Sequence, residues 1–197
     1  MVKIPLFPLN TVLFPEGKLQ LRIFEPRYVD MISESLRTDT GFGICLIREG
    51  EEAGQPAAFF PMGTYARIID WDQLSDGLLG VTVEGQRRFK VESSELRKDN
   101  LRVGEITWLD EDDDILPVSY QGFSDLLKEI ANRYELPLME EPERFDEANW
   151  VSERLAELLP FELSAKQELL EMDNALRRFD YIQALLEKID AGELGQD

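Results

Sequence analysis

Four prolines among the first 26 residues most strongly limit what this chain can form. They are Pro5, Pro8, Pro15 and Pro26. Each lacks the backbone N–H that a helix needs and biases the preceding residue toward extended geometry. No helix can therefore cross residues 1–25. The apolar residues between the prolines predict a short strand followed by an ordered, packed loop.

The residues after Pro15 predict a strand and then a helix. Residues 19–23 alternate apolar and polar side chains, which is typical of a strand with one solvated face. Pro26 suits the first helical turn because its φ is already fixed. We expect the helix that follows to bury one stripe, formed by Tyr28, Val29, Ile32 and Leu36.

This opening resembles the Lon amino-terminal domain, the substrate-binding domain at the front of ATP-dependent Lon proteases. The matching features are the hydrophobic-Pro-Leu start, the Val-Leu-Phe-Pro turn at 12–15 and the Phe-Glu-Pro-Arg-Tyr helix entry at 24–28. Residues 63–66 and 83–89 resemble two later elements of that domain, and residues 159–177 resemble its carboxy-terminal helical part. The resemblance implies a pseudo-barrel related to PUA domains.

The pattern up to residue 109 independently predicts a sheet. Short strands are expected at 44–47, 62–71, 78–85 and 101–109, and a turn at 84–85 is expected to lead into a further strand up to residue 91. Strands at this spacing favour a compact, mostly antiparallel sheet or barrel that holds one early helix.

A run of five acids at 110–114 marks the expected boundary, because like charges repel and favour solvent. The run lacks the interspersed glycine of a calcium loop, so a solvated linker is favoured over a cation site. We expect a mostly β subdomain at 1–112, a helical subdomain at 113–192 and a flexible tail at 193–197.

Beyond this boundary the hydrophobic period becomes helical. Helices are expected at 119–134, at 147–159, from Ser164 and at 175–189, and Ser164 to Gln167 has the capping-box pattern. Four short amphipathic helices predict a small bundle. The expected fold class is α+β, with a carboxy-terminal α-helical bundle and, as the Lon resemblance implies, an amino-terminal PUA-like β pseudo-barrel.

Catalytic equipment is scarce in this sequence. It contains no histidine and one cysteine, Cys45, which excludes Ser-His-Asp and Cys-His catalysis and the usual zinc sites. The P-loop motif of an ATPase is absent as well. Cys45 lies in an apolar run and is expected to be a buried small hydrophobe. We expect a stand-alone, non-enzymatic form of the domain, without ATPase or protease domains, cofactor or metal.

The net charge of −19 is unevenly placed. Residues 1–109 hold 13 basic and 16 acidic side chains, whereas residues 110–197 hold 8 and 24. A nucleic-acid backbone would be repelled by the second part, so nucleic acid is not an expected partner. No apolar run of about eighteen residues and no signal peptide is indicated, so we expect a cytoplasmic protein without a membrane partner.

The resemblance to the Lon substrate-binding domain, together with the scarcity of catalytic equipment, implies a module that recognises unfolded or extended polypeptide segments, by strand addition to a sheet edge or in a groove. The candidate lining residues are Leu13, Phe14, Phe24, Tyr28, Phe59 and Phe60. Three tryptophans, Trp71, Trp108 and Trp150, are expected in cores, and Arg27 is expected to pair with Glu25 or another acid. Two alternatives remain open, a small-molecule-binding or carboxylate-based hydrolytic domain and a scaffold that docks onto one dedicated protein.

Overall fold

The chain divides into two units, which meet in sequence at the acidic run. A computed structural model describes residues 2–110 and 114–192, and the units are Met1–Asp110 and Glu111–Asp197. Residues 111–113 of the acidic run and the expected tail at 193–197 lie outside the described residues. Each unit is therefore described by itself.

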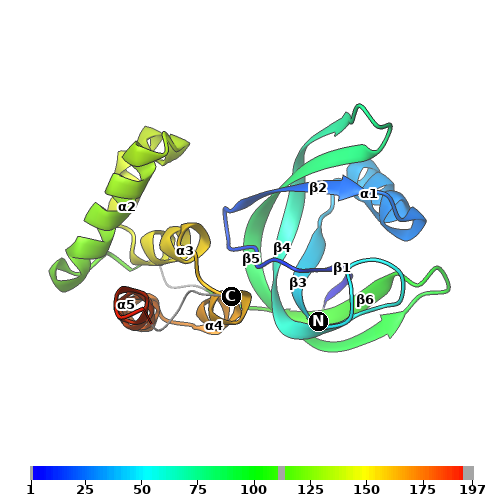
Figure 1. Cartoon of the computed structure of the whole chain (residues 1–197). Coiled ribbons are helices and arrows are strands. Elements are labelled where there is room, and N and C mark those ends of the chain that lie inside the picture. Colours follow the sequence, from blue (N-terminus) through cyan, green and yellow to red (C-terminus); the bar gives the residue numbers. More distant parts are fainter. Residues whose placement is uncertain (1, 111–113, 193–197) are drawn as a thin grey trace. The chain divides into compact units, whose positions relative to one another are not determined.

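The first unit is a sheet that closes on itself. Its elements are β1 (Val2–Leu9), β2 (Lys18–Ile23), α1 (Pro26–Thr38), β3 (Phe42–Glu49), β4 (Ala58–Gln73), β5 (Leu79–Leu96) and β6 (Arg102–Trp108). The strand order is β2-β5-β4-β3-β1-β6, and β5 also pairs with β6. Five strands thus form a circuit, β1–β3–β4–β5–β6 and back to β1, while β2 adds to β5 outside it (Figure 1).

The prolines of β1 are tolerated because this strand changes partner in its middle. Residues 2–6 pair antiparallel with β6, and residues 6–9 pair parallel with β3. Pro5 lies in the first half and Pro8 in the second, so each has one flank without a ladder. A proline cannot donate to a ladder and is accepted in a strand where one side is unpaired. The predicted proline-broken strand is confirmed.

The expected packed loop follows at residues 10–17. Thr64 Oγ1 donates a hydrogen bond of 2.6 Å to the Leu13 carbonyl oxygen. The backbone also passes directly over β5, since a Cβ on Gly85 would lie 2.2 Å from the Phe14 carbonyl oxygen. Only glycine permits this approach. The loop is therefore pinned onto β4 and β5.

The prediction of a turn at residues 84–85 is wrong, because these residues lie within β5. β5 continues through this point to Leu96, and the pairing with β4 shifts by one residue between Tyr65 and Ala66. Gln86 is the extra residue, so the irregularity is a β-bulge. A bulge bends a strand and increases its twist without ending it, which is why a turn-like sequence lies within one long strand.

Helix α1 packs on the sheet with the predicted stripe, except at its end. Tyr28, Met31 and Ile32 join one core cluster with residues from the strands. The stripe continues to Ser35, which is buried, and not to Leu36, which is 41% exposed. One residue turns the helix by about 100°, so Leu36 was wrongly assigned to the buried face.

The second unit is helical within its described residues. Its elements are η1 (Val118–Tyr120), α2 (Gln121–Arg133), η2 (Pro137–Glu140), η3 (Pro142–Asp146), α3 (Ala148–Leu158), α4 (Leu163–Glu171) and α5 (Ala175–Asp190). Helix α3 contacts α2, α4 and α5. The expected capping box is wrong, because Ser164 lies inside α4 and no side chain caps that helix. Helix α5 is capped instead by Asn174, whose side chain accepts from two backbone N–H groups.

A buried arginine ties α5 to α3. The side chain of Arg178 is 1% exposed, and its guanidinium donates to Ser152 Oγ and to the Met172 carbonyl oxygen, both at 2.9 Å. It also lies 3.7 Å from the carboxylate of Glu153, which is 5% exposed. Buried charges persist when they are paired and hydrogen-bonded. This cluster therefore holds the helical unit together at its centre.

Candidate functional site

The six apolar residues expected to bind polypeptide occupy different environments. Leu13, Phe14 and Tyr28 are buried in the first unit, and Leu13 and Tyr28 share one core cluster. Phe59 and Phe60 are half-buried in β4, which begins at Ala58, earlier than expected. Phe24 is 59% exposed and directly follows β2. Of the six, it is the side chain most open to a partner.

The conspicuous helix entry at 24–28 is a structural clamp. Arg27 forms an ion pair of 2.9 Å with Glu25 and donates 3.2 Å to the Asn100 carbonyl oxygen. Its guanidinium also lies 4.7 Å from the centre of the Tyr28 ring, which stacks on Phe7 at 3.9 Å. Burial raises the pKa of Tyr28. The expected pairing of Arg27 is confirmed, and the clamp joins the start of α1 to the turn before β6.

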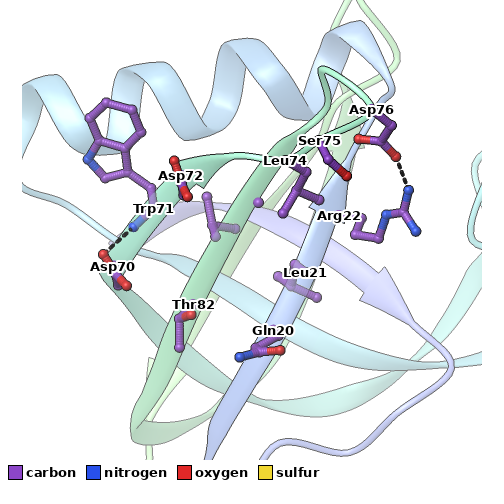
Figure 2. A pocket seen from close by; sticks show the side chains of 12 residues that line it. Gln20, Leu21, Arg22, Asp70, Trp71, Asp72, Leu74, Ser75, Asp76 and Thr82 are labelled. Atoms are coloured by element: carbon purple, nitrogen blue, oxygen red, sulfur yellow. Dashed lines mark hydrogen bonds and ion pairs between the residues drawn. The ribbon is translucent and has the colours of Figure 1, made fainter.

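A hollow of about 590 Å³ lies on the face of β2, β5 and β4 (Figure 2). The pairing register sets two rows of residues across these strands, Gln20, Thr82 and Asp70, then Arg22, Gly80 and Asp72. Directly paired residues in a sheet project to the same face. The rows therefore define the floor of the hollow, and the turn after β4 forms one end of it.

Gly80 lies in the middle of the second row and lets this turn fold over the sheet. A Cβ at this position would lie 2.8 Å from Leu74 Cδ2. Because glycine has no side chain, Leu74 can settle over β5 beside the hollow. In Figure 2 the pair formed by Arg22 and Asp76 lies on the β2 side, opposite Asp70 and Trp71 on the β4 side.

Trp71 was expected in a core, and the structure shows this to be wrong. Its side chain is 59% exposed, whereas Trp150 is buried and Trp108 is half-buried against Tyr65. The reason is tertiary, since β3 pairs with β4 up to Ala66 and leaves the following residues of β4 without a neighbour on that flank. The flanking acids at 70 and 72 were the sequence signal for an exposed strand end.

Within the described part of the chain, β4 has no strand partner beyond Ala66 on the side away from β5, and β2 has none on its outer side. These two free edges differ in how their backbone N–H groups are satisfied. On β4, the N–H of Trp71 donates 2.9 Å to Asp70 Oδ1, and the N–H of Gln73 donates 2.7 Å to Asp72 Oδ1. Side chains thus occupy these donors, which blunts an edge against pairing. On β2, no side chain within residues 2–110 and 114–192 is hydrogen-bonded to the strand backbone. The edge of β2 therefore remains open.

The two faces of β2 have distinct chemistry. Leu19 and Leu21 are half-buried and pack against the core cluster under α1. The opposite row is exposed and carries Lys18, Gln20 and Arg22. An extended segment placed along this edge would therefore have an apolar neighbour row on one face and a polar, cationic row on the other.

The described residues give little indication of a reactive cysteine or a metal site. Cys45 is buried, and its burial raises the pKa of the thiol. Thiols react as thiolates, so this cysteine is held in its unreactive form. Across residues 2–110 and 114–192, no cluster of three or more His, Cys, Asp or Glu side chains has an arrangement suited to a metal ion.

Membrane insertion by a helix also finds no support. None of the helices within the described residues combines the length and apolar character needed to span a bilayer.

Comparison with known proteins places the chain in a family. The profile of the ATP-dependent protease La (LON) substrate-binding domain matches residues 3–188. The chain belongs to this family. The Lon resemblance of the amino-terminal segment thus extends over nearly the whole chain.

Several Lon proteins show how this domain relates to longer chains. The Lon proteases of Cytophaga hutchinsonii and Haemophilus influenzae are 25% and 26% identical to it, over 94% and 93% of this chain but 24% of their own length. A Lon N-terminal domain protein from Xanthomonas campestris has a similar structure, with a TM-score of 0.78, 36% identity and coverage of 93% of this chain and 98% of that one.

A more distant Lon structure shares the fold. The N-terminal domain of Mycobacterium avium complex Lon protease has a TM-score of 0.66 at 14% identity, over 92% of this chain and 98% of that one. The Lon N-terminal fold, a mostly sheet domain followed by helices, is therefore established here. The chain spans about a quarter of the length of the curated Lon proteases that it matches.

Proposed function

We propose that this Lon-family domain binds extended segments of other polypeptides, without a catalytic step, along the free edge of β2. The observation that carries the proposal is the contrast between the two edges. The donors at the end of β4 are satisfied by aspartate side chains, whereas the backbone of β2 is left open. A strand with unpaired N–H and C=O groups is a template for another strand.

Binding by strand addition divides the work between backbone and side chains. Backbone hydrogen bonds supply affinity independent of sequence, and pockets for alternate side chains supply selectivity. Here the hollow lies on one face of the β2 edge. Phe24 is exposed and directly follows the last residue of β2. Phe24 is the expected binding residue best placed for direct contact, while Leu13, Phe14 and Tyr28 would act by supporting the sheet.

The family supports this role, since the matching profile is that of a substrate-binding domain. The absence of histidine and of a P-loop motif in the sequence is consistent with a non-enzymatic role. No specific observation favours a carboxylate-based hydrolytic site or a single dedicated partner. The proposed partners are therefore unfolded or extended polypeptides.

The finer architecture is part of the same proposal. We interpret the closed circuit of strand pairs as the PUA-like pseudo-barrel, and the packing of α2, α4 and α5 on α3 as the helical bundle. The proposed subdomains are 1–112 and 113–192. In this interpretation β2 lies outside the closed circuit, which leaves it available to a partner.

Fluorescence anisotropy of a labelled, permanently unfolded polypeptide tests this function. We expect saturable binding in the absence of nucleotide. Leu21→Lys places a charge on the apolar face of the edge strand, so it should weaken binding at least about tenfold. Leu163→Lys is the matched control, because Leu163 is 39% exposed in α4, and it should leave affinity unchanged.

A peptide-side experiment guards against misfolding of the Leu21→Lys variant. A short binding peptide that is N-methylated at alternate residues loses the donors that face β2, and the same number of methyl groups in the other phase leaves those donors intact. We expect one phase to lose binding and the other to retain it. Equal binding of both phases, or no saturable binding by the wild-type protein, would contradict strand addition.

A further inference from the structure

Given the polypeptide binding proposed above, on which this inference rests, we propose that the β2 edge selects segments whose residues alternate between apolar and acidic. The apolar residues would lie beside Leu19 and Leu21, and the acidic residues beside Lys18 and Arg22. The occupant is thus an extended, amphipathic, negatively charged segment of another chain.

The pleat of the strand sets the alternation. Successive side chains of an added strand point to opposite faces, with a period of two. The half-buried Leu19 and Leu21 already pack on the core cluster, so apolar neighbours on that face would extend the core. The other face presents Lys18, Gln20 and Arg22, all exposed, and it contains no acid within β2.

The charge of Lys18 is available to a partner. Glu84 is its cross-strand neighbour on β5, yet the carboxylate of Glu84 accepts a hydrogen bond of 3.3 Å from Gln86. Among the described residues, no carboxylate lies within ion-pair distance of the Lys18 ammonium. A cross-strand carboxylate from an added segment would supply that partner.

Arg22 also keeps capacity for a second carboxylate. Its ion pair with Asp76 uses Nη2, and the side chains of both partners are partly exposed, at 65% and 41%. A guanidinium has five N–H donors, so a further carboxylate can bind beside the first. Opposite charges directly across a strand pair are favourable. The β2 row itself therefore complements acid, whereas Asp70 and Asp72 on the same face lie two strands away, on β4.

Three octapeptides with the same alternating valines test the inference, with Glu, Gln or Lys at the other positions. We expect the Glu peptide to bind about tenfold more tightly than the Lys peptide, with the Gln peptide between them. Raising the salt concentration should shrink the difference, because exposed charges are screened.

The double variant Lys18→Gln/Arg22→Gln should bring the affinities for the Glu and Gln peptides within about twofold of each other. The Gln peptide should still bind this variant saturably, because the backbone hydrogen bonds of strand addition remain. The matched control is Lys90→Gln/Lys98→Gln, which removes two exposed cations elsewhere in the first unit, and it should retain the preference for Glu.

The outcomes separate the two proposals. If the Gln peptide binds but the wild type shows no preference for Glu, or if the Lys18→Gln/Arg22→Gln variant retains that preference, the charge selection is overturned and strand addition stands. If none of the three peptides binds the wild type, the proposed function fails and the selection fails with it.

Discussion

The two units satisfy the hydrogen bonds of their backbone N–H and C=O groups in different ways. In the helical unit, each helix satisfies its own N–H and C=O groups along its length, and a buried charged cluster around Arg178 fixes the packing. In the sheet unit, the backbone is satisfied by neighbouring strands, and at β2 the neighbours run out. Recognition of another backbone is therefore a property that the sheet unit can have.

The two units also differ in charge. Residues 110–197 carry three times as many acidic as basic side chains, whereas residues 1–109 are close to balance. The acidic unit nevertheless has an arginine at its centre, 1% exposed. Surface charge therefore gives a poor guide to what stabilises this unit, and the buried arginine is the better target for perturbation.

Arg178→Ala should give the largest effect. It removes the guanidinium that lies 3.7 Å from the buried Glu153 carboxylate, and breaking a buried pair in this way costs about 3–5 kcal/mol. We expect that loss in the free energy of unfolding measured with urea, and amide hydrogen exchange should accelerate most in α3 and α5. A loss below about 1 kcal/mol would show that the cluster is not the centre of the unit.

Gly85→Ala should give an intermediate effect in the sheet unit. The new Cβ would lie 2.2 Å from the Phe14 carbonyl oxygen, and such overpacking costs about 1–3 kcal/mol. The matched change in the helical unit is Gly122→Ala. A Cβ at Gly122, within α2, meets no atom within 4 Å, so alanine should stabilise by about 0.5–1 kcal/mol.

Urea unfolding of the two glycine variants measures both signs in one experiment. Destabilisation by Gly85→Ala with stabilisation by Gly122→Ala would support the contrast between a sheet backbone packed against neighbouring segments and a helix backbone that bonds to itself. Destabilisation by both variants, or by neither, would break it.

Tyr181 should give the smallest effect, through pH. Its hydroxyl donates 2.6 Å to Glu168, and this hydrogen bond together with burial raises the pKa of Tyr181 to about 12. The unfolded tyrosine loses its proton near 10, so the stabilisation is complete below that pH. It disappears as the pH rises to about 12.

Comparison with Tyr181→Phe isolates this dependence. The difference in unfolding free energy between wild type and variant should be constant below pH 10 and fall above it. A difference that stays constant up to pH 12 would contradict the assignment, and an absorbance titration of the phenols provides a second reading of the same pKa.

Much of the fold could be predicted from local patterns. The prolines specified a strand and a packed loop, and the alternation at 19–23 and the helix entry at Pro26 gave β2 and α1. These signals depend on residues close in sequence. The errors at residues 84–85 and Ser164 were local patterns overridden by their surroundings, since β5 accommodates its extra residue, Gln86, as a bulge and α4 begins one residue before Ser164.

The candidate site was less accessible to such reasoning. It combines strands that are distant in sequence, and the register that sets Arg22, Gly80 and Asp72 in one row is a property of their pairing. The exposure of Trp71 depends on where β3 stops. The predicted binding candidates are Leu13 and five aromatic residues, but residue type does not distinguish a buried ring such as Phe14 from an exposed one such as Phe24.

The change of partner in β1 has a consequence for how the chain reaches this structure. Val2 pairs with Ile106, so the circuit of strands is completed by the first strand and the last one of the unit. Pairings between residues so far apart in sequence are slow to form, because the long loop must close first. During synthesis, β1 must wait for β6 before the circuit can close. Residues 2–5 of β1 therefore stay without a strand partner until β6 has been synthesised.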